Sequence, residues 1–236
     1  MLHKLENRTM AHNLKSTGRR TSVESVFDHL YEEIVSMRLL PGTKISEAEI
    51  AGQFNISRQP VRDAFSRLEN LDLLLIQPQK ATEVKRFSSA TITTVRFVRA
   101  SVEAEVLRRA ARICDQAGSD VLEARLTEQL EAVNTKNYDE FRALDYNFHK
   151  ALCTIGKVDF AFDVIQKEKT KVDRLCVLAM TRNERLDQLL EDHRQIAQMV
   201  SENNEEGAVK AGMLHLSRLD ATIDTIRKEN TDYFDD

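Results

Sequence analysis

The sequence predicts a mainly α-helical protein in two parts, a small N-terminal part with short helices and a hairpin, and a larger bundle of helices. The 236 residues include seven glycines, three prolines and no tryptophan, which favours helices over a turn-rich β fold. Apolar residues recur at helical spacing along most of the chain. Runs typical of β-strands are confined to residues 73–87, so strands make up only a small part of the predicted fold.

The N-terminal part begins with a predicted helix at residues 22–37, where apolar side chains recur every three to four positions. Pro41 and Gly42 then predict a turn. Ser46 and Glu49 have the S-x-x-E spacing of a capping box, in which each side chain bonds the backbone of the other residue. They predict the start of a short second helix.

A third helix is predicted over residues 58–71, with Ser57 as its N-cap. Two β-prone runs, 73–77 and 82–87, flank a polar turn and predict a two-stranded hairpin. Helix, short helix, helix and hairpin in this order are typical of a winged helix-turn-helix, which we place at residues 21–87.

From residue 88 onward the patterns are helical only, and the short loops between them predict an antiparallel bundle of six to seven helices. We place this all-helical domain at residues 88–230, after a flexible arm at 1–20 and before a frayed acidic tail at 231–236. The helical patterns cover residues 88–116, 119–135, 137–155, 158–181, 183–202 and 205–229.

Bulk properties narrow the class of protein. Residues 1–87 carry a formal charge of +2 and the remainder carries −6, which is compatible with a polyanionic partner for the N-terminal part. The three cysteines lack CxxC spacing, so we expect reduced core thiols and a cytoplasmic protein. No apolar run approaches the ~18 residues of a membrane helix, and the N-terminus lacks the apolar segment of a signal peptide.

An aspartate and three histidines lie on apolar faces of the predicted bundle. Asp145 and His149 are one helical turn apart and share a face. His193 and His215 are equidistant from a break near residue 204, so an antiparallel pair joined there brings them to the same height. Burying such groups costs free energy unless something pairs with them. A hydrogen bond to a neighbour suffices for one histidine, whereas all four groups together predict a divalent metal site for Zn, Ni, Mn or Fe.

Two arginines, Arg58 and Arg62, lie near the start of the third helix and off its apolar face. A recognition helix enters the major groove with its N-terminal residues leading, and arginines there contact guanine or phosphate. The alternative is that they are solvated side chains paired with Asp63 and Glu69. The capped helix before them and the hairpin after them favour DNA binding.

These elements resemble the winged helix of the GntR family of bacterial transcription regulators. The family motif S-R-x-P-V-R-x-A is matched in full from Ser57 to Ala64. The resemblance implies that Arg58, Gln59 and Arg62 face the DNA, with the hairpin tip in the adjacent minor groove. Ser57, at the head of the motif, completes the predicted DNA-binding set.

The bundle is similar to the ligand-binding domain of the FadR subfamily within that family, and the resemblance covers nearly all of residues 22–229. In the metal-containing branch, a D-x-x-x-H pattern and two later histidines hold a divalent metal. Asp145, His149, His193 and His215 match these positions one by one. The resemblance therefore implies the metal site that the helix faces predict.

Several positions depart from the family pattern. Ala48 stands where members often have arginine, and Asp72 stands where a glycine usually precedes the first strand. Ala81 replaces the glycine common at the wing tip, so Lys80 is the residue of the wing that we expect to contact DNA. Lys157 occupies a loop position where many members have asparagine.

Three nitrogens and one carboxylate oxygen leave open positions on a five- or six-coordinate ion, which a small carboxylate effector can fill. Arg99 lies on the apolar stripe of the first bundle helix, where its guanidinium could clamp that carboxylate. The alternative is an ion pair with Glu103, one turn away. The resemblance favours contact with the effector.

We therefore predict a homodimeric transcription regulator rather than an enzyme. Its predicted partners are double-stranded DNA with a palindromic operator and a small hydroxy, keto or sugar acid that modulates operator affinity. One alternative is a helical metalloenzyme acting on a carboxylate, although the sequence has no H-E-x-x-H motif and no glycine-rich phosphate loop. Another is a metal that only stabilises the bundle.

Overall fold

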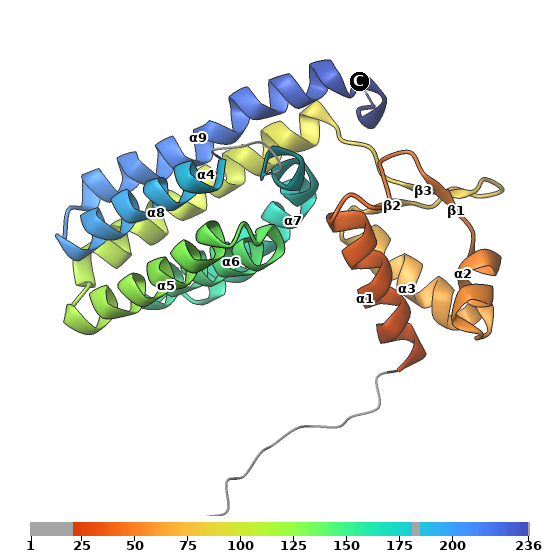
Figure 1. Cartoon of the computed structure of the whole chain (residues 1–236), viewed down its shortest axis with the longest axis horizontal. Coiled ribbons are helices and arrows are strands. Elements are labelled where there is room, and N and C mark those ends of the chain that lie inside the picture. The colour runs from red at the N-terminus through yellow and green to blue at the C-terminus, as the bar shows by residue number, and fades with distance from the viewer. Residues whose placement is uncertain (1–20, 181–184, 236) are drawn as a thin grey trace, which may run out of the picture.

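The computed structural model describes residues 21–180 and 185–235. The predicted arm at 1–20 lies outside this part of the chain, as does most of the loop predicted at 180–183. Figure 1 shows a small domain of helices and a sheet at one end of a layered helical bundle, so the predicted fold class is confirmed.

The N-terminal domain packs three helices against a three-stranded antiparallel sheet of order β1-β3-β2. The predicted hairpin is present as β2 and β3. The sequence did not reveal β1, because two residues are too few to show an alternating pattern. The elements are α1 (Ser22–Val35), β1 (Lys44–Ile45), α2 (Glu47–Phe54), α3 (Arg58–Asn70), β2 (Leu74–Leu75) and β3 (Thr82–Val84).

The N-terminal caps of these helices agree only in part with those that the sequence predicts. The backbone N–H of Glu49 donates to Ser46 Oγ at 3.1 Å, as the S-x-x-E spacing predicts. Ser57 does occupy the N-cap position of α3, but its side chain makes no capping hydrogen bond. A complete capping box, which the sequence analysis missed, joins Thr21 and Glu24 at the start of α1.

The bundle contains the six predicted helices within the described residues. α5 begins inside the stretch predicted as a break, because Asp115 caps it by accepting a hydrogen bond from the N–H of Gly118 at 2.9 Å. The helices are α4 (Ser89–Ile113), α5 (Gln116–Asn134), α6 (Tyr138–Ile155), α7 (Phe160–Met180), α8 (Arg185–Ser201) and α9 (Glu205–Glu229).

A short turn between α8 and α9 fixes the position of these two helices relative to each other along their axes. Asn203 takes the left-handed conformation with φ 55°. Its side-chain amide donates to the carbonyls of Ala111 and Cys114 at 2.7 and 3.0 Å, which fixes the hairpin to the end of α4. Figure 1 shows α8 and α9 running side by side along α4.

The C-terminal segment packs against the linker between the two domains. Phe87 N donates to Tyr233 O at 2.8 Å, Asp235 N donates to Phe87 O at 3.0 Å, and the rings of Phe87 and Phe234 lie 5.4 Å apart. The expectation of a frayed tail is therefore wrong for the described residues. Its acidic composition suggested fraying, but two aromatic residues anchor it in an apolar cluster that joins the domains.

This joining cluster draws residues from the N-terminal domain, the linker, three bundle helices and the tail. Its buried members are Met37, Phe87, Ile92, Val95, Val172, Leu175, Ile223, Ile226 and Phe234.

Polar contacts from α6 and α7 also reach the N-terminal domain. The fully buried Arg174 donates from Nη1 to the carbonyl of Lys85 at 2.6 Å, and its guanidinium lies 4.5 Å from the centre of the Phe87 ring. Arg142 pairs with Glu32 of α1 at 3.2 Å. The N-terminal domain therefore rests on α6 and α7, the helices beside the candidate site.

Replacing Phe234 with alanine should lower the free energy of unfolding by about 3 kcal/mol, because it leaves a cavity where a buried ring contacted the linker. Chemical denaturation measures this change. The matched control is Phe160→Ala, at a side chain that is 74% exposed, for which we expect a change below ~0.5 kcal/mol. Equal, small effects of both variants would show that the tail does not anchor the linker.

Candidate functional site

The four residues singled out in the bundle meet in its core. Asp145 and His149 come from α6, His193 from α8 and His215 from α9. All four are buried, and one potential ligand atom from each lies within 4.8 Å of the others. The three imidazole ring centres are 4.8 to 5.6 Å apart. The structure thus brings together side chains that are up to 70 positions apart in sequence.

Two of the imidazoles turn an unpaired nitrogen toward this cluster. His149 Nδ1 lies 3.1 Å from Glu103 Oε2, and His193 Nδ1 lies 2.8 Å from Gln129 Oε1. Gln129 uses its amide N–H on the carbonyl of Leu144, so its oxygen accepts from His193. The Nε2 atoms of both histidines are buried without a hydrogen-bond partner. Because Nδ1 of each ring is the donor, Nε2 is the nitrogen that a neutral imidazole would offer, as a lone pair, to the cluster.

The aspartate completes the arrangement. Asp145 Oδ1 lies 3.5 Å from His193 Nε2 and 3.9 Å from His149 Nε2. His215 Nδ1 lies 3.7 Å from Asp192 Oδ2, and Arg218 holds Asp192 through a hydrogen bond of 2.9 Å. Glu103, Gln129 and Asp192, which lie against the three imidazoles from outside the cluster, come from α4, α5 and α8.

Sequence analysis missed these supporting residues as part of the site. Gln129 carries a signal that could have identified it, since it is a polar side chain on the buried face of α5. Asp192 immediately precedes a predicted ligand, and Glu103 was considered only as a partner for Arg99.

Electrostatics leave the cluster in a state that suits cation binding. Burial alone raises the pKa of Asp145, but Lys169 and the neighbouring imidazoles lower it by more, so the pKa lies well below its usual value. Burial lowers the pKa of His193 and of His215, and His215 lowers that of His193 further. The cluster therefore offers a charged carboxylate and at least two neutral imidazoles, the forms that bind metal ions.

Arg99 forms the ion pair with Glu103 that the sequence analysis gave as the alternative to effector binding. Its Nε donates to Glu103 Oε1 at 2.8 Å, and both side chains are buried. Burial raises the pKa of Glu103, but Arg99 and His149 lower it to about 2, so the carboxylate is charged. Arg99 also lines a void of about 30 Å³ between α4, α7 and α9, with Val95 and Val172 on its walls.

A buried lysine that the sequence analysis did not consider lies beside the cluster. Lys169 Nζ on α7 is 3.1 Å from Asp145 Oδ2 and donates to Asp173 Oδ1 at 2.8 Å. It also lies 4.0 Å from the centre of the Tyr146 ring. Its position between Ile165 and Val172 on the buried face of α7 was the available signal.

The predicted DNA-binding residues lie on the exposed face at the start of α3 and on the hairpin. Ser57, Arg58, Gln59 and Lys80 are exposed. The Arg62 guanidinium donates two hydrogen bonds, of 3.1 and 3.0 Å, to Glu47 of α2, while its side chain is 58% exposed.

The partners of two of these residues lie close by. The side-chain amide of Gln59 donates to Asp63 at 2.9 Å. The partner of Arg62 is thus on the preceding helix, and not Asp63 or Glu69 as the alternative interpretation proposed.

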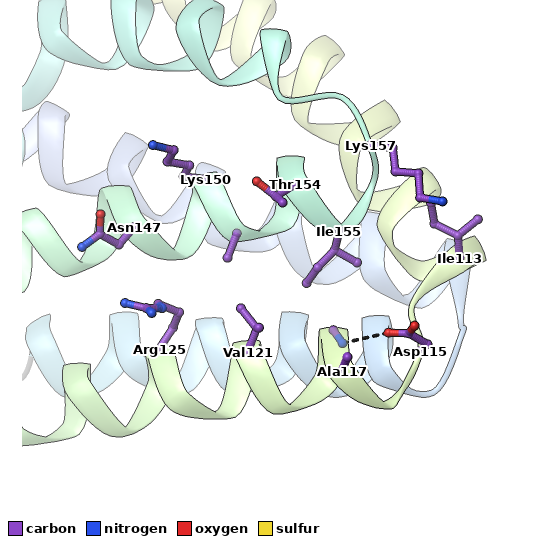
Figure 2. A pocket seen from close by; sticks show the side chains of 12 residues that line it. Ile113, Asp115, Ala117, Val121, Arg125, Asn147, Lys150, Thr154, Ile155 and Lys157 are labelled. Carbon is purple, nitrogen blue, oxygen red and sulfur yellow. Dashed lines mark hydrogen bonds between the residues drawn. The ribbon is translucent and has the colours of Figure 1, made fainter.

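A groove of about 610 Å³ lies along α5 and α6. Figure 2 shows the side chains that line it. Arg125, Lys150 and Lys157 line it together with apolar side chains, and none of the four clustered residues does. Lys157, which departs from the family pattern, therefore faces this outer groove. In the described part of the chain, no helix is both long enough and apolar enough to span a membrane.

A winged helix-turn-helix domain joined to a helical bundle is the architecture of a transcription regulator. Residues 22–84 match the family of bacterial regulatory proteins named gntR, and residues 94–218 match the FCD domain. The chain belongs to the GntR family, in its FadR-like subfamily with an FCD domain at the C-terminal end.

Curated relatives agree with this assignment. The HTH-type transcriptional repressor RspR of Escherichia coli K12 is 33% identical over 211 residues, which are 89% of this chain and 92% of the relative. The gluconate operon transcriptional repressor of Bacillus licheniformis is 26% identical over 77% of this chain and 71% of its own length.

The fold is shared with two solved regulators. McbR/YncC of E. coli has a TM-score of 0.71 at 15% identity, covering 87% of this chain and 98% of that one. A putative GntR regulator from Rhodococcus sp. RHA1 has a TM-score of 0.67 at 20% identity, covering 85% and 96%.

Proposed function

We propose that this transcription regulator binds a palindromic operator as a homodimer, and that a small carboxylate held at a divalent metal in the bundle modulates its operator affinity. The observation that carries the proposal is the convergence of Asp145, His149, His193 and His215, with unpaired Nε2 atoms of two imidazoles turned inward. Buried polar atoms without partners are rare in folded proteins, and a cation satisfies all of these at once.

The donor set fits a transition metal. Three imidazole nitrogens and one carboxylate oxygen suit Zn, Ni, Mn or Fe. Glu103 and Gln129 hold two of the rings by their outer nitrogens, as the supporting residues of metal-binding histidines do. The bound ion would supply positive charge and open coordination positions for an anionic ligand.

The effector class has further support from a relative. The regulator from B. licheniformis is named for a gluconate operon, and gluconate is a small sugar carboxylate. A hydroxy, keto or sugar acid can bridge the ion to a cationic side chain of the chain itself.

The proposed DNA contacts are those of the exposed start of α3, namely Ser57, Arg58, Gln59 and Arg62, with Lys80 on the hairpin. The helix N-terminus favours phosphate, and the arginines suit guanine or phosphate. Because Arg62 is exposed and pairs with a partly exposed carboxylate, the cost of exchanging that partner for DNA is small.

The homodimer is supported by apolar side chains on the outer surface of the bundle. Phe97 of α4 is 73% exposed and Leu214 of the neighbouring α9 is 45% exposed. A contact between two copies that covers these side chains would remove their apolar surface from water. A two-fold axis through the dimer requires a palindromic operator.

Two other functions are distinguishable from this one. A metalloenzyme would turn over candidate carboxylates, whereas a sensor shows a thermal shift without turnover. A purely structural metal would raise stability without changing affinity for the effector. The regulators among the relatives favour the sensor over the enzyme.

Substituting His149 or His215 by alanine should abolish stoichiometric metal uptake, because each variant removes one of four ligands. Elemental analysis after dialysis against Ni²⁺, together with the Ni²⁺-induced rise in Tm, measures this. His29→Ala, in the N-terminal domain against Phe54, is the matched control and should bind metal like the unaltered protein. Normal uptake by both bundle variants would exclude the proposed ligands.

Gln129→Leu should weaken metal binding by roughly 10- to 100-fold, because His193 then loses the acceptor that fixes its ring. Competition with a chelator of known affinity measures the change. Exposed Gln198→Leu on α8 is the control for loss of an amide. An unchanged affinity in the Gln129 variant would mean that this contact does not orient the ring.

Arg58→Ala should weaken DNA binding and reduce the slope of log affinity against log salt by about one, if its contact is to a phosphate. Gel shifts on the region upstream of its own gene, at several salt concentrations, measure both. Arg109→Ala, on the exposed side of α4, removes a charge far from α3 and should leave the slope unchanged. The absence of any sequence-specific, salt-sensitive shift would contradict operator binding.

A further inference from the structure

We propose that Lys169 is the second anchor for the anionic group of the effector, and that it transmits binding to the N-terminal domain through Asp173. This inference rests on the proposed function. Lys169 is 4% exposed, which is rare for a lysine, and it contacts the one carboxylate of the metal cluster.

The charges around the cluster call for an anion once a metal is bound. Arg99 and Lys169 are buried against three buried carboxylates, those of Glu103, Asp145 and Asp173. Asp192 is balanced by Arg218. With the three imidazoles in the neutral form that binds metal, the group carries one net negative charge, and a divalent ion changes this to one net positive charge. Uncompensated buried charge is costly, so a ligand with a single negative charge fits best.

Lys169 is better placed for this ligand than Arg99. Arg99 is held by Glu103, and Glu103 in turn holds the outer nitrogen of His149. Drawing Arg99 to an effector would release a carboxylate that supports a ligand. Lys169 instead lies against Oδ2 of Asp145, the oxygen opposite the one that faces the imidazoles.

A metal at Asp145 would compete with the ammonium for that carboxylate. The two positive charges also repel each other at this distance. An anion bound to the ion and to Lys169 removes the repulsion and gives the ammonium a new partner. A lysine suits this exchange because its charge is compact and its stem is flexible.

Lys169 also contacts Asp173, on the helix that packs against α1 of the N-terminal domain. Asp173 is fully buried, accepts from Lys169 at 2.8 Å and accepts a second hydrogen bond from the Tyr146 hydroxyl. Its charge acts on Tyr31 of α1, where burial and then Asp173 raise the pKa of the phenol. The next residue, Arg174, donates to the carbonyl of Lys85 in the linker.

An anion that draws the ammonium toward the metal therefore weakens its bond to Asp173. The negative charge of Asp173 is then less compensated, on the helix that packs against α1. The buried position of every partner keeps these interactions strong, since water screens them little. The effector then couples to DNA binding to the extent that the packing of α1 on α7 depends on this charge, because a ligand shifts only an equilibrium between states that it binds unequally.

The test uses the full chain loaded with Ni²⁺, with acetate, lactate and gluconate as probes. Lys169→Met should keep stoichiometric Ni²⁺ but bind the best of these carboxylates about 10- to 100-fold more weakly, as expected on losing a hydrogen bond to a charged group. Isothermal calorimetry measures both affinities. Lys171→Met is the matched control, since Lys171 lies two residues further along α7 and pairs with Glu168.

If the single variant fails to fold, the double variant Lys169→Met with Asp173→Asn restores the balance of buried charge and should show the same loss. Asp173→Asn alone separates binding from transmission. It should bind Ni²⁺ and the carboxylate, while the carboxylate no longer changes the affinity for operator DNA.

Carboxylate binding that survives Lys169→Met but is lost in Arg99→Met would overturn the anchor role of Lys169. An unaltered DNA response in the Asp173 variant would overturn the transmission. If the unaltered protein binds Ni²⁺ but none of the carboxylates, the effector part of the proposed function fails instead. If it binds no Ni²⁺, the metal site itself fails.

Discussion

The structure of the bundle depends on the compensation of polar groups buried at its centre. Asp145, His149, His193 and His215 come from three helices and occupy positions where apolar side chains would pack at no electrostatic cost. Each imidazole of α6 and α8 has one satisfied nitrogen and one unsatisfied nitrogen. A buried polar network in which some atoms lack hydrogen-bond partners is unfavourable unless a ligand supplies those partners. The same arrangement that lowers stability without a ligand therefore makes binding of a cation favourable.

Residues of α7 connect this buried network to the N-terminal domain. Lys169 connects Asp145 to Asp173 on α7, and α7 supports both α1 and the linker. The apolar joining cluster adds a second route, because Val95 and Val172 belong to it and also line the void beside Arg99. A ligand bound at the cluster, as proposed, would therefore contact helices that pack against the N-terminal domain.

The sequence was sufficient for the fold class and for the residues of the cluster, because both depend on periodicity. A four-residue spacing places Asp145 and His149 on one face, and the symmetry of the α8–α9 turn places His193 opposite His215.

The spacing of residues along one helix does not show which residues of other helices it contacts. The sequence therefore did not identify Gln129, Lys169 and Asp173 as part of the site. Arg99 shows the same limit, since a guanidinium on an apolar stripe fits either an effector or Glu103. The prediction for the tail was wrong because its acidic composition suggested a solvated segment, whereas two aromatic side chains pack it against the joining cluster.

X-ray absorption at the metal K-edge of the loaded protein tests the central claim most directly. The account predicts an inner shell of nitrogen and oxygen atoms only, with the multiple-scattering pattern of three imidazoles at about 2.0–2.1 Å if the ion is zinc. Sulfur in the inner shell, or a spectrum without imidazole scattering, would place the metal elsewhere and contradict it.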